Sequence, residues 1–150
     1  MNPQFFLSRA ANAMDLPLPR RYTAAAAGLD LHANVHETVC IKKGCRYLVP
    51  TGIMIALPIG YEAQVRPRSG LALKHGVTIL NAPGTVDADY RGEIGALLIN
   101  LGDEDFFVNR GDRVAQLVIA KVEMIDFELV ENLPTSVRSA HGFGSTGMSS

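Results

Sequence analysis

The 150-residue chain has no tryptophan and only two cysteines, Cys40 and Cys45, without Cys-x-x-Cys spacing or a nearby histidine pair. Two such cysteines cannot supply a disulfide framework, so we expect reduced structural thiols in a cytoplasmic protein. The four histidines share no ligand spacing. A zinc site is therefore not expected.

Long apolar runs are also missing, since no stretch approaches the ~20 residues that a membrane span requires. Residues 1–9 lack a basic n-region and a long apolar h-region, so we expect no signal peptide and no membrane partner. The net charge is only −1, which argues against broad nucleic-acid binding. A polyanionic ligand must therefore be held by locally placed arginines and backbone amides.

The composition, 47% hydrophobic and 19% charged, is that of a soluble globular protein. We expect one domain over residues 1–150, with a lead-in at residues 1–20 that its prolines keep from forming a long helix. From residue 135 to 150 the chain is rich in glycine and serine. Such a flexible C-terminal arm cannot offset its ordering entropy by burial, so it is either dispensable or orders over a ligand.

Short β-rich runs alternate with turn residues along most of the chain, which favours an all-β sandwich or jelly roll. One internal helix is expected at residues 69–76, ending at Gly76, and a short helical piece within residues 5–14. Residues 93–100 are apolar on both faces, which indicates a central strand. The expected strands are 29–31, 38–41, 46–49, 52–57, 61–66, 77–80, 93–100, 106–108, 113–122 and, weakly, 126–130.

Residues 81–92 combine a turn, an aromatic ring and charges of both signs. Pro83 and Gly84 suit a turn between two short strands, because Pro83 presets φ and Gly84 tolerates positive φ. Asp87 and Asp89 are two residues apart, so both carboxylates face one side if that piece is extended. Together with Tyr90, these groups suit a small charged ring compound, although an ordinary acidic hairpin accounts for the same residues.

Three other positions suggest an anion site. Arg68, Ser69 and Gly70 stand at the mouth of the expected helix, where unpaired N–H groups favour anions, and Ser69 is equally suited to be an N-cap. Gln116 interrupts an apolar run, which is costly unless its amide has a partner. Asp30 lies between two leucines, as a structural acceptor or near a cation.

The C-terminal arm contains a Gly-x-Gly-x-x-Gly match at residues 142–147. A dinucleotide site needs a helix after this pattern, and only three residues follow, so we reject that interpretation. Closely spaced glycines can instead bring backbone N–H groups to phosphate oxygens. Ser145 and Thr146 add hydroxyl donors, Arg138 adds charge, and Phe143 adds a ring that could cover a base. A disordered tail is the alternative.

In order along the chain, these segments resemble the five motifs of the trimeric dUTPases, the deoxyuridine triphosphate nucleotidohydrolases. The resemblance covers about residues 20–147. It implies a β jelly-roll homotrimer whose active sites combine motifs of more than one subunit, with the C-terminal arm closing over a neighbour's site. The implied reaction is hydrolysis of dUTP to dUMP and pyrophosphate, which keeps uracil out of DNA and supplies dUMP. The matching segments are 27–31, 67–72, 84–94, 110–117 and 138–147.

For the nucleoside, the resemblance implies that Asp87 is the catalytic carboxylate. It would orient and deprotonate a water for in-line attack on the α-phosphorus. Asp89 receives no catalytic role. Tyr90 would pack against the deoxyribose, and Asn81 with the backbone near Gly84 and Gly95 would bind uracil.

For the phosphates, the resemblance implies contacts from Arg68, Ser69, Gly70 and Gln116. Asp30 would lie near Mg²⁺ through water, since the family holds this cofactor mainly through triphosphate oxygens and water molecules. The arm would place Phe143 over uracil and Arg138 on the γ-phosphate. The arm residues expected to contact substrate are Arg138, Phe143, Gly144, Ser145 and Thr146.

Three alternatives compete with this interpretation. A dCTP deaminase shares the fold, but its second motif resembles Arg-Ser-Ser followed by a further arginine, whereas Gly70 follows Ser69 here. A non-catalytic nucleotide-binding regulator would lack the carboxylate that Asp87 supplies. A purely structural β trimer would leave the order of the motifs unexplained.

Overall fold

The computed structural model describes residues 3–136 and 139–140. Its strands and helices follow one another closely, and none of the helices within these residues is long and apolar enough to cross a membrane. In chain order the elements are β1 (Phe6–Arg9), the 3₁₀ helix η1 (Ala11–Ala13), β2 (Leu29–His32), β3 (Val39–Ile41), β4 (Arg46–Pro50), β5 (Ile53–Ala56), β6 (Tyr61–Arg66), α1 (Ser69–His75), β7 (Val77–Ile79), β8 (Gly84–Val86), β9 (Gly95–Asn100), β10 (Phe106–Val108) and β11 (Arg113–Lys121).

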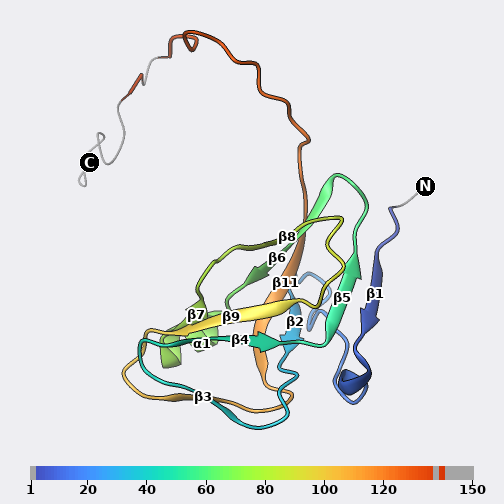
Figure 1. Ribbon diagram of the computed structural model, residues 1–150, viewed down its shortest axis with the longest axis vertical. Coiled ribbons are helices and arrows are strands. Elements are labelled where there is room, and N and C mark those ends of the chain that lie inside the picture. Colours follow the sequence, from blue (N-terminus) through green and yellow to red (C-terminus); the bar gives the residue numbers. More distant parts are fainter. Residues whose placement is uncertain (1–2, 137–138, 141–150) are drawn as a thin grey trace.

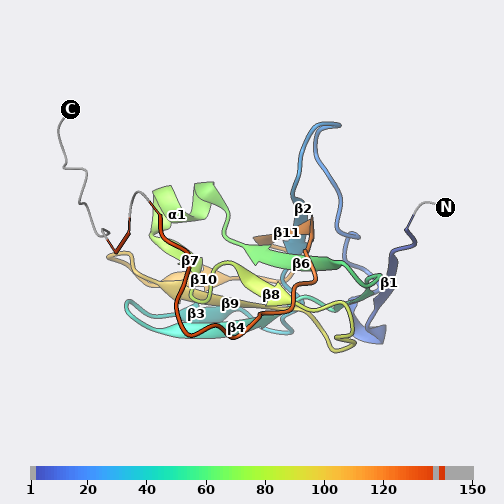
Figure 2. The same cartoon turned by 90° about the horizontal axis from the view of Figure 1, so that it is seen from above.

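Two antiparallel sheets form the body of the molecule, one in the order β2-β11-β6-β8 and one in the order β4-β9-β7. Figure 2 shows β6 and β11 in one layer and β4 and β9 in the other. The core lies between them, where Leu31 and Leu117 of the first sheet and Val49 and Leu98 of the second are at most 2% exposed. The expected all-β jelly-roll sandwich with one short helix is confirmed, and β9 is a central strand as its apolar faces predict.

Helix α1 ends at Gly76, which adopts φ +65° and donates its N–H to the carbonyls of Ala72 and Leu71. A left-handed residue at this position is the usual glycine stop, so the expected helix end is confirmed. The cap at the other end is Arg68 rather than Ser69, because the N–H groups of Leu71 and Ala72 both bond the Arg68 carbonyl. The alternative role of Ser69 as an N-cap is therefore wrong.

Both ends of the described chain differ from the sequence expectation. The helix expected within residues 5–14 is replaced by β1 and η1, because β1 pairs with β5 and this tertiary pairing outweighs local helix propensity. The weak strand expected at residues 126–130 does not form, since no strand of the same protomer lies beside it to pair with. Instead residues 122–136 extend away from the body (Figure 1), with Phe127 92% and Leu129 99% exposed.

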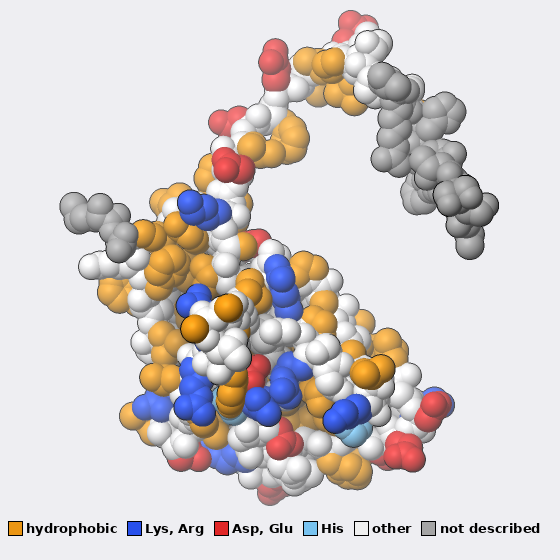
Figure 3. All heavy atoms as spheres, turned by 180° about the vertical axis from the view of Figure 1, so that it is seen from behind, with side chains coloured by type: hydrophobic (Ala, Val, Ile, Leu, Met, Phe, Trp, Pro, Cys, Tyr) orange, Lys and Arg blue, Asp and Glu red, His pale blue; other side chains and the backbone are white. Residues whose placement is uncertain are grey.

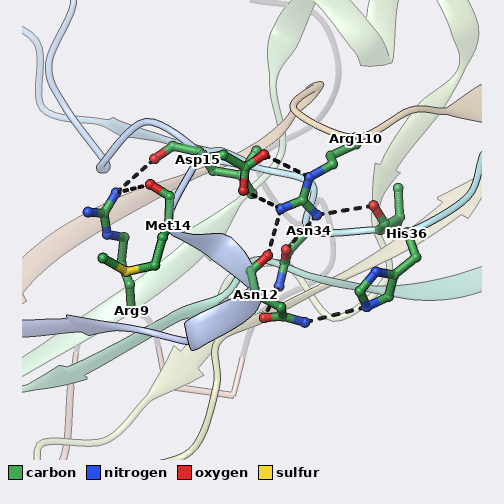
Figure 4. Close-up of polar contacts among 9 residues, drawn as sticks. Arg9, Asn12, Met14, Asp15, Asn34, His36 and Arg110 are labelled. Atoms are coloured by element: carbon green, nitrogen blue, oxygen red, sulfur yellow. Dashed lines mark hydrogen bonds and ion pairs between the residues drawn. The ribbon is translucent and has the colours of Figure 1, made fainter.

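The N-terminal segment is tied to the body by Arg110 (Figure 4). Its guanidinium donates to both carboxylate oxygens of Asp15, at 3.0 and 2.6 Å, to the Asn12 carbonyl at 2.6 Å and to Asn34 Oδ1 at 2.8 Å. These bonds from Arg110 lower the pKa of Asp15, and the same contact raises the pKa of Arg110. The first arginine of the segment 110–117 therefore holds structure together rather than facing a ligand.

Candidate active site

The strand β8 and the turns on either side of it build one wall of a cavity. Gly84 begins the strand with an extended backbone, so the positive φ considered for a turn there is wrong. Glycine allows a close approach at this position instead, because a Cβ would lie 3.2 Å from Asn81 Nδ2 and 3.4 Å from Val65 Cβ. The turn itself occupies residues 80–83, one step earlier in the chain.

Asp87 and Asp89 do not share a face, because residues 87–90 form a turn in which the Tyr90 N–H bonds the Asp87 carbonyl at 3.2 Å. Asp87 reaches an open cavity of about 240 Å³ that Asp89 does not line, and both residues line the adjacent cleft. Only Asp87 therefore has access to the first cavity, and its catalytic role stays a prediction. The cavity, called the nucleoside cavity below, is lined by five of the candidate residues: Asn81, Gly84, Asp87, Tyr90 and Gly95.

Hydrogen bonds fix the segment that follows the turn carrying Asp87 and Tyr90. Thr51 Oγ1 donates to the Ile94 carbonyl at 2.6 Å, and the Gly52 N–H donates to Glu93 Oε1 at 2.6 Å. The Tyr90 hydroxyl donates to the Glu93 carbonyl at 3.2 Å, which holds the ring at the cavity. Side chains set by such bonds are preorganised for binding and catalysis.

A second group of polar side chains lies where β2, β11 and the end of β6 meet. Gln116 of β11 stands opposite Asp30 of β2 and Arg66 of β6. Its carboxamide nitrogen donates to the Pro67 carbonyl at 2.9 Å, so the polar residue that interrupts an apolar run has the partner it needs. Because Arg68 follows directly, this bond also fixes the turn that presents it.

Asp30 holds two arginines in this group. Its carboxylate lies 3.1 Å from Arg113 Nη1 and 3.7 Å from Arg68 Nε, and its side chain is only 14% exposed. Arg68 in turn donates from Nη1 to the Arg113 carbonyl at 2.9 Å. A carboxylate between two guanidinium groups is compensated by both, so Asp30 helps to fix the orientation of Arg68 and Arg113. We call Asp30, Arg68, Arg113 and Gln116 the arginine cluster.

Arg113 was not among the residues expected from sequence. The pairing of β11 with β2 shifts register between Arg113 and Ala115, so Val114 and Ala115 are both buried. This bulge breaks the alternation of the strand, and Arg113 joins the side of Asp30 rather than the core side of Ala115. The ring of Tyr22 lies 4.8 Å from the Arg113 guanidinium. Only the doubling of apolar residues at 114–115 signalled the bulge in advance.

His32 is a further residue that the sequence did not single out. It is 6% exposed, and its Nδ1 atom has no hydrogen-bond partner among residues 3–136 and 139–140. Burial lowers the pKa of His32, Asp30 acts in the opposite direction, and Arg113 lowers it further. The neutral imidazole is thus favoured beside the arginine cluster.

Asp87 and Arg68 lie near opposite ends of β6, and the nucleoside cavity extends along β6 as far as Val65. In the ladder between β6 and β8, Ala63 pairs with Val86, the residue before Asp87, whereas Arg68 follows the other end of β6. Five residue steps from Ala63 to Arg68 correspond to roughly 17 Å at ~3.3 Å per strand residue. One protomer therefore holds Asp87 and Arg68 apart. The arm residues Arg138, Phe143, Gly144, Ser145 and Thr146 lie outside the described part of the chain.

Among residues 3–136 and 139–140, potential metal ligands do not converge in a protein-only site. Within the described residues, no three histidine, cysteine or acidic side chains lie close enough together to hold an ion. Asp30 is engaged by arginines, and Asp87 stands at the nucleoside cavity. A metal at this site would need most of its ligands from a bound molecule or from water.

Solved structures of known proteins share this fold. A dUTPase of Staphylococcus bacteriophage 80alpha, described with dUPNHPP, aligns with a TM-score of 0.86 over 97% of this chain and 99% of its own, at 24% identity. A dUTPase mutant of the S. aureus phage phi11, whose description concerns coordination of a structural Mg(II) ion, aligns with a TM-score of 0.75 at 23% identity, over 86% of this chain and 97% of its own.

Sequence comparison is more specific. The family model described as dUTPase matches residues 14–147. A deoxyuridine 5'-triphosphate nucleotidohydrolase of Syntrophotalea carbinolica is 59% identical over 130 residues, covering 87% of this chain and 88% of its own length. A protein of the same name from Beijerinckia indica is 54% identical over 147 residues, covering 97% of this chain and 92% of its own. The chain belongs to the dUTPase family.

Proposed function

We infer that this chain is a dUTP diphosphatase, which hydrolyses dUTP to dUMP and pyrophosphate. This activity keeps uracil out of DNA and supplies dUMP for dTMP synthesis. Family membership and the shared name of its relatives support the activity. The observation that carries it here is the nucleoside cavity, where a carboxylate, an aromatic ring and glycine backbone converge at a fixed turn.

Asp87 serves as the general base in this proposal. Its carboxylate accepts a proton from a water molecule as the water oxygen attacks the α-phosphorus in line. The bond between the α-phosphorus and the bridging oxygen breaks, and pyrophosphate leaves with the electron pair. Because Glu93 and Ile94, which follow the turn, are bonded to the Thr51–Ile53 segment, the backbone that carries Asp87 is positioned before substrate arrives.

The rest of the cavity would select the nucleoside. Asn81 and the backbone at Gly84 and Gly95 present donors and acceptors to the edge of uracil. The Tyr90 ring, held by its hydroxyl bond to Glu93, would pack on the deoxyribose and leave no room for a 2′-hydroxyl. Steric exclusion of this kind would discriminate against ribonucleotides without any change in the hydrogen bonds to the base.

The phosphates would be bound by the arginine cluster with Ser69 and Gly70, whose N–H groups stand at the first turn of α1. The α-phosphorus beside Asp87 and the γ-phosphorus are separated by only two P–O–P linkages. That is much shorter than the roughly 17 Å between Asp87 and Arg68 estimated from strand geometry. One substrate therefore needs the nucleoside cavity of one protomer and the arginine cluster of another, and we propose a homotrimer with shared sites.

The projecting segment supports such an assembly. Residues 122–131 intersperse apolar and acidic side chains along an extended path, and Figure 3 shows hydrophobic groups exposed there. Exposed side chains such as Phe127 and Leu129 are stabilised only if another surface covers them. We propose that residues 1–150 act as one domain, and that residues 135–150 are the arm that closes over a neighbour's site through Arg138 and Phe143.

Mg²⁺ is the cofactor that this donor set suits. The described residues offer no ligand triad, and Asp30 is already paired with Arg68 and Arg113, which fits contact through water alone. Mg²⁺ retains several waters and takes its other ligands from substrate phosphates in sites of this kind. When bound, the ion would neutralise charge on the triphosphate. Because Cys40 and Cys45 are free thiols, we place the enzyme in the cytoplasm.

The test is incubation of the full chain with dUTP, dCTP and dTTP in the presence of Mg²⁺, with products separated. We expect pyrophosphate and dUMP from dUTP alone. An Asp87→Asn variant should bind dUTP but turn it over at least about 100-fold more slowly, since a positioned base contributes roughly that much. Asp89→Asn is the matched control and should stay near wild type. Ammonia released from dCTP, or near-normal turnover by Asp87→Asn, would contradict the proposal.

A further inference from the structure

An exposed leucine stands at the edge of the nucleoside cavity without an evident structural task. Leu48 of β4 lines the cavity, yet it is 61% exposed. Of the other apolar lining residues, Leu97 is half-buried, and Val65, Val86 and Ile94 are at most 8% exposed and belong to the core. Those three side chains are fixed by folding, whereas Leu48 contributes little to the core.

The pairing of β4 with β9 brings Leu48 over Gly95. Leu48 pairs with Leu97, and Pro50 pairs with Gly95, so Leu48 and Gly95 are diagonal neighbours on one face. A Cβ at position 95 would lie 2.6 Å from Leu48 Cδ1 and 3.2 Å from Leu48 Cγ. The leucine therefore fills the volume that a side chain at position 95 would otherwise use.

This arrangement divides the cavity wall into two chemical parts. The backbone of Gly84 and Gly95 and the amide of Asn81 offer hydrogen bonds, which suit the polar edge of a pyrimidine. The carbon edge of the same ring needs an apolar surface, and Leu48 supplies that surface beside Gly95. Because Leu48 is not locked into the core, its size sets how much room remains at that edge.

We propose that Leu48 is a specificity-determining residue, the apolar wall of the base pocket that limits access of pyrimidines substituted at C5. The proposal rests on the proposed function, since it assigns Leu48 to the site of dUTP. Removing the wall leaves the catalytic carboxylate and the phosphate ligands in place. Leu48→Ala therefore weakens binding of uracil nucleotides and admits the methyl group of thymine.

The test compares Leu48→Ala, the size-preserving Leu48→Met and a control, Leu101→Ala, in the full-length protein. Leu101 is similarly exposed, at 66%, and does not line the cavity. For Leu48→Ala we expect the ratio of dTTP to dUTP hydrolysis, measured as kcat/KM, to rise about tenfold, the scale of an apolar pocket contact. KM for dUTP should rise while kcat changes less than about twofold. Leu48→Met and Leu101→Ala should keep the wild-type ratio.

Binding of dUMP and dTMP, measured by calorimetry, separates this inference from the proposed function. If the wild-type protein does not hydrolyse dUTP, the function fails, while a change in the dTMP-to-dUMP affinity ratio on Leu48→Ala still supports the wall. If wild-type activity is present and Leu48→Ala keeps the wild-type ratios of both hydrolysis and affinity, the proposed role of Leu48 is refuted. Melting temperature and native mass are recorded for each variant, and Leu48→Val replaces Leu48→Ala if the latter does not assemble.

Discussion

Gly28 and Gln116 fit together as a pair, because the carboxamide oxygen of Gln116 fills the space that a Cβ at position 28 would need. The nitrogen of the same amide donates to the Pro67 carbonyl at 2.9 Å, next to Arg68. A glycine before β2 thus sets the orientation of an amide on β11, and that amide sets the turn that presents an arginine. The three candidate phosphate-binding segments are coupled through one side chain.

Gly28→Ala should therefore disturb the phosphate site as well as the fold. The added methyl group displaces Gln116 and breaks its bond to Pro67, which we expect to cost about 1–3 kcal/mol of unfolding free energy. We expect kcat/KM for dUTP to fall by roughly tenfold. Urea unfolding and steady-state kinetics measure the two effects.

The control is the same substitution in a Gln116→Ala background. With the amide removed, a Cβ at position 28 meets no carboxamide, so Gly28→Ala should cost much less there. Equal costs in both backgrounds would show that position 28 acts through its backbone alone.

Asp15→Asn should loosen the N-terminal segment in a pH-dependent way. Because Arg110 lowers the pKa of Asp15, the stabilisation is complete above the ordinary carboxyl pKa of about 3.9 and is lost as the pH falls through the lower folded value. We expect the variant to unfold more easily than wild type at pH 7, with the difference shrinking as the pH falls below the ordinary carboxyl pKa. Chemical unfolding over a series of pH values measures it.

Asp103→Asn is a matched control for that experiment. Asp103 has a lowered pKa through Lys43, but this pair has a single close contact at 2.8 Å and an aspartate that is 96% exposed. Exposed single-contact pairs stabilise proteins little, so this variant should behave almost as wild type. A larger effect from Asp103→Asn than from Asp15→Asn would contradict the role given to Arg110.

His32→Gln should flatten the dependence of stability on pH. Burial lowers the pKa of His32 in the folded protein, so below about pH 6.5 the unfolded chain binds a proton that the folded chain does not. Stability of the wild type therefore falls as the pH drops from 6.5 to the folded pKa. Arg20, Arg68 and Arg113 oppose the charged imidazole and Asp30 favours it, so burial decides the direction.

The measurement is the difference in unfolding free energy between wild type and His32→Gln from pH 7.5 to 5. A neutral glutamine binds no proton, so the difference should shift in favour of the variant as the pH falls. Parallel curves for the two proteins would place the pH dependence elsewhere in the chain.

Removal of residues 135–150 should separate catalysis from assembly. We expect a severe loss of dUTP turnover, because Arg138 and the glycine-rich segment are gone, with the native mass of a trimer retained. In this proposal, residues 122–136 serve assembly rather than catalysis. Replacing both Phe127 and Leu129 by aspartate should therefore weaken assembly. Chromatography with light scattering, together with activity, distinguishes the two variants; a truncated chain that fails to fold would assign the arm a structural role.

Much of this protein follows from local sequence patterns. Alternating and β-branched runs specified strands β3 to β7 and β9 to β11 within a few residues, and Gly76 specified the end of α1. Such features depend on side-chain period and on φ at single residues, which a chain carries wherever it folds. The ordered motifs likewise identified Asp87 and Tyr90, which the structure brings to one cavity.

Tertiary structure alone decided which charged groups meet. The bulge in β11 places Arg113 beside Asp30, and packing of the N-terminal segment brings Asp15 to Arg110, 95 residues away. No local pattern encodes these partners, because they depend on strand register and on how distant segments dock. The separation of Asp87 from Arg68 has the same origin. Asp87 follows β8 and Arg68 lies just beyond β6, and because these two strands are antiparallel, the two residues lie near opposite ends of β6. This separation supports the proposal that a complete site combines two copies of the chain.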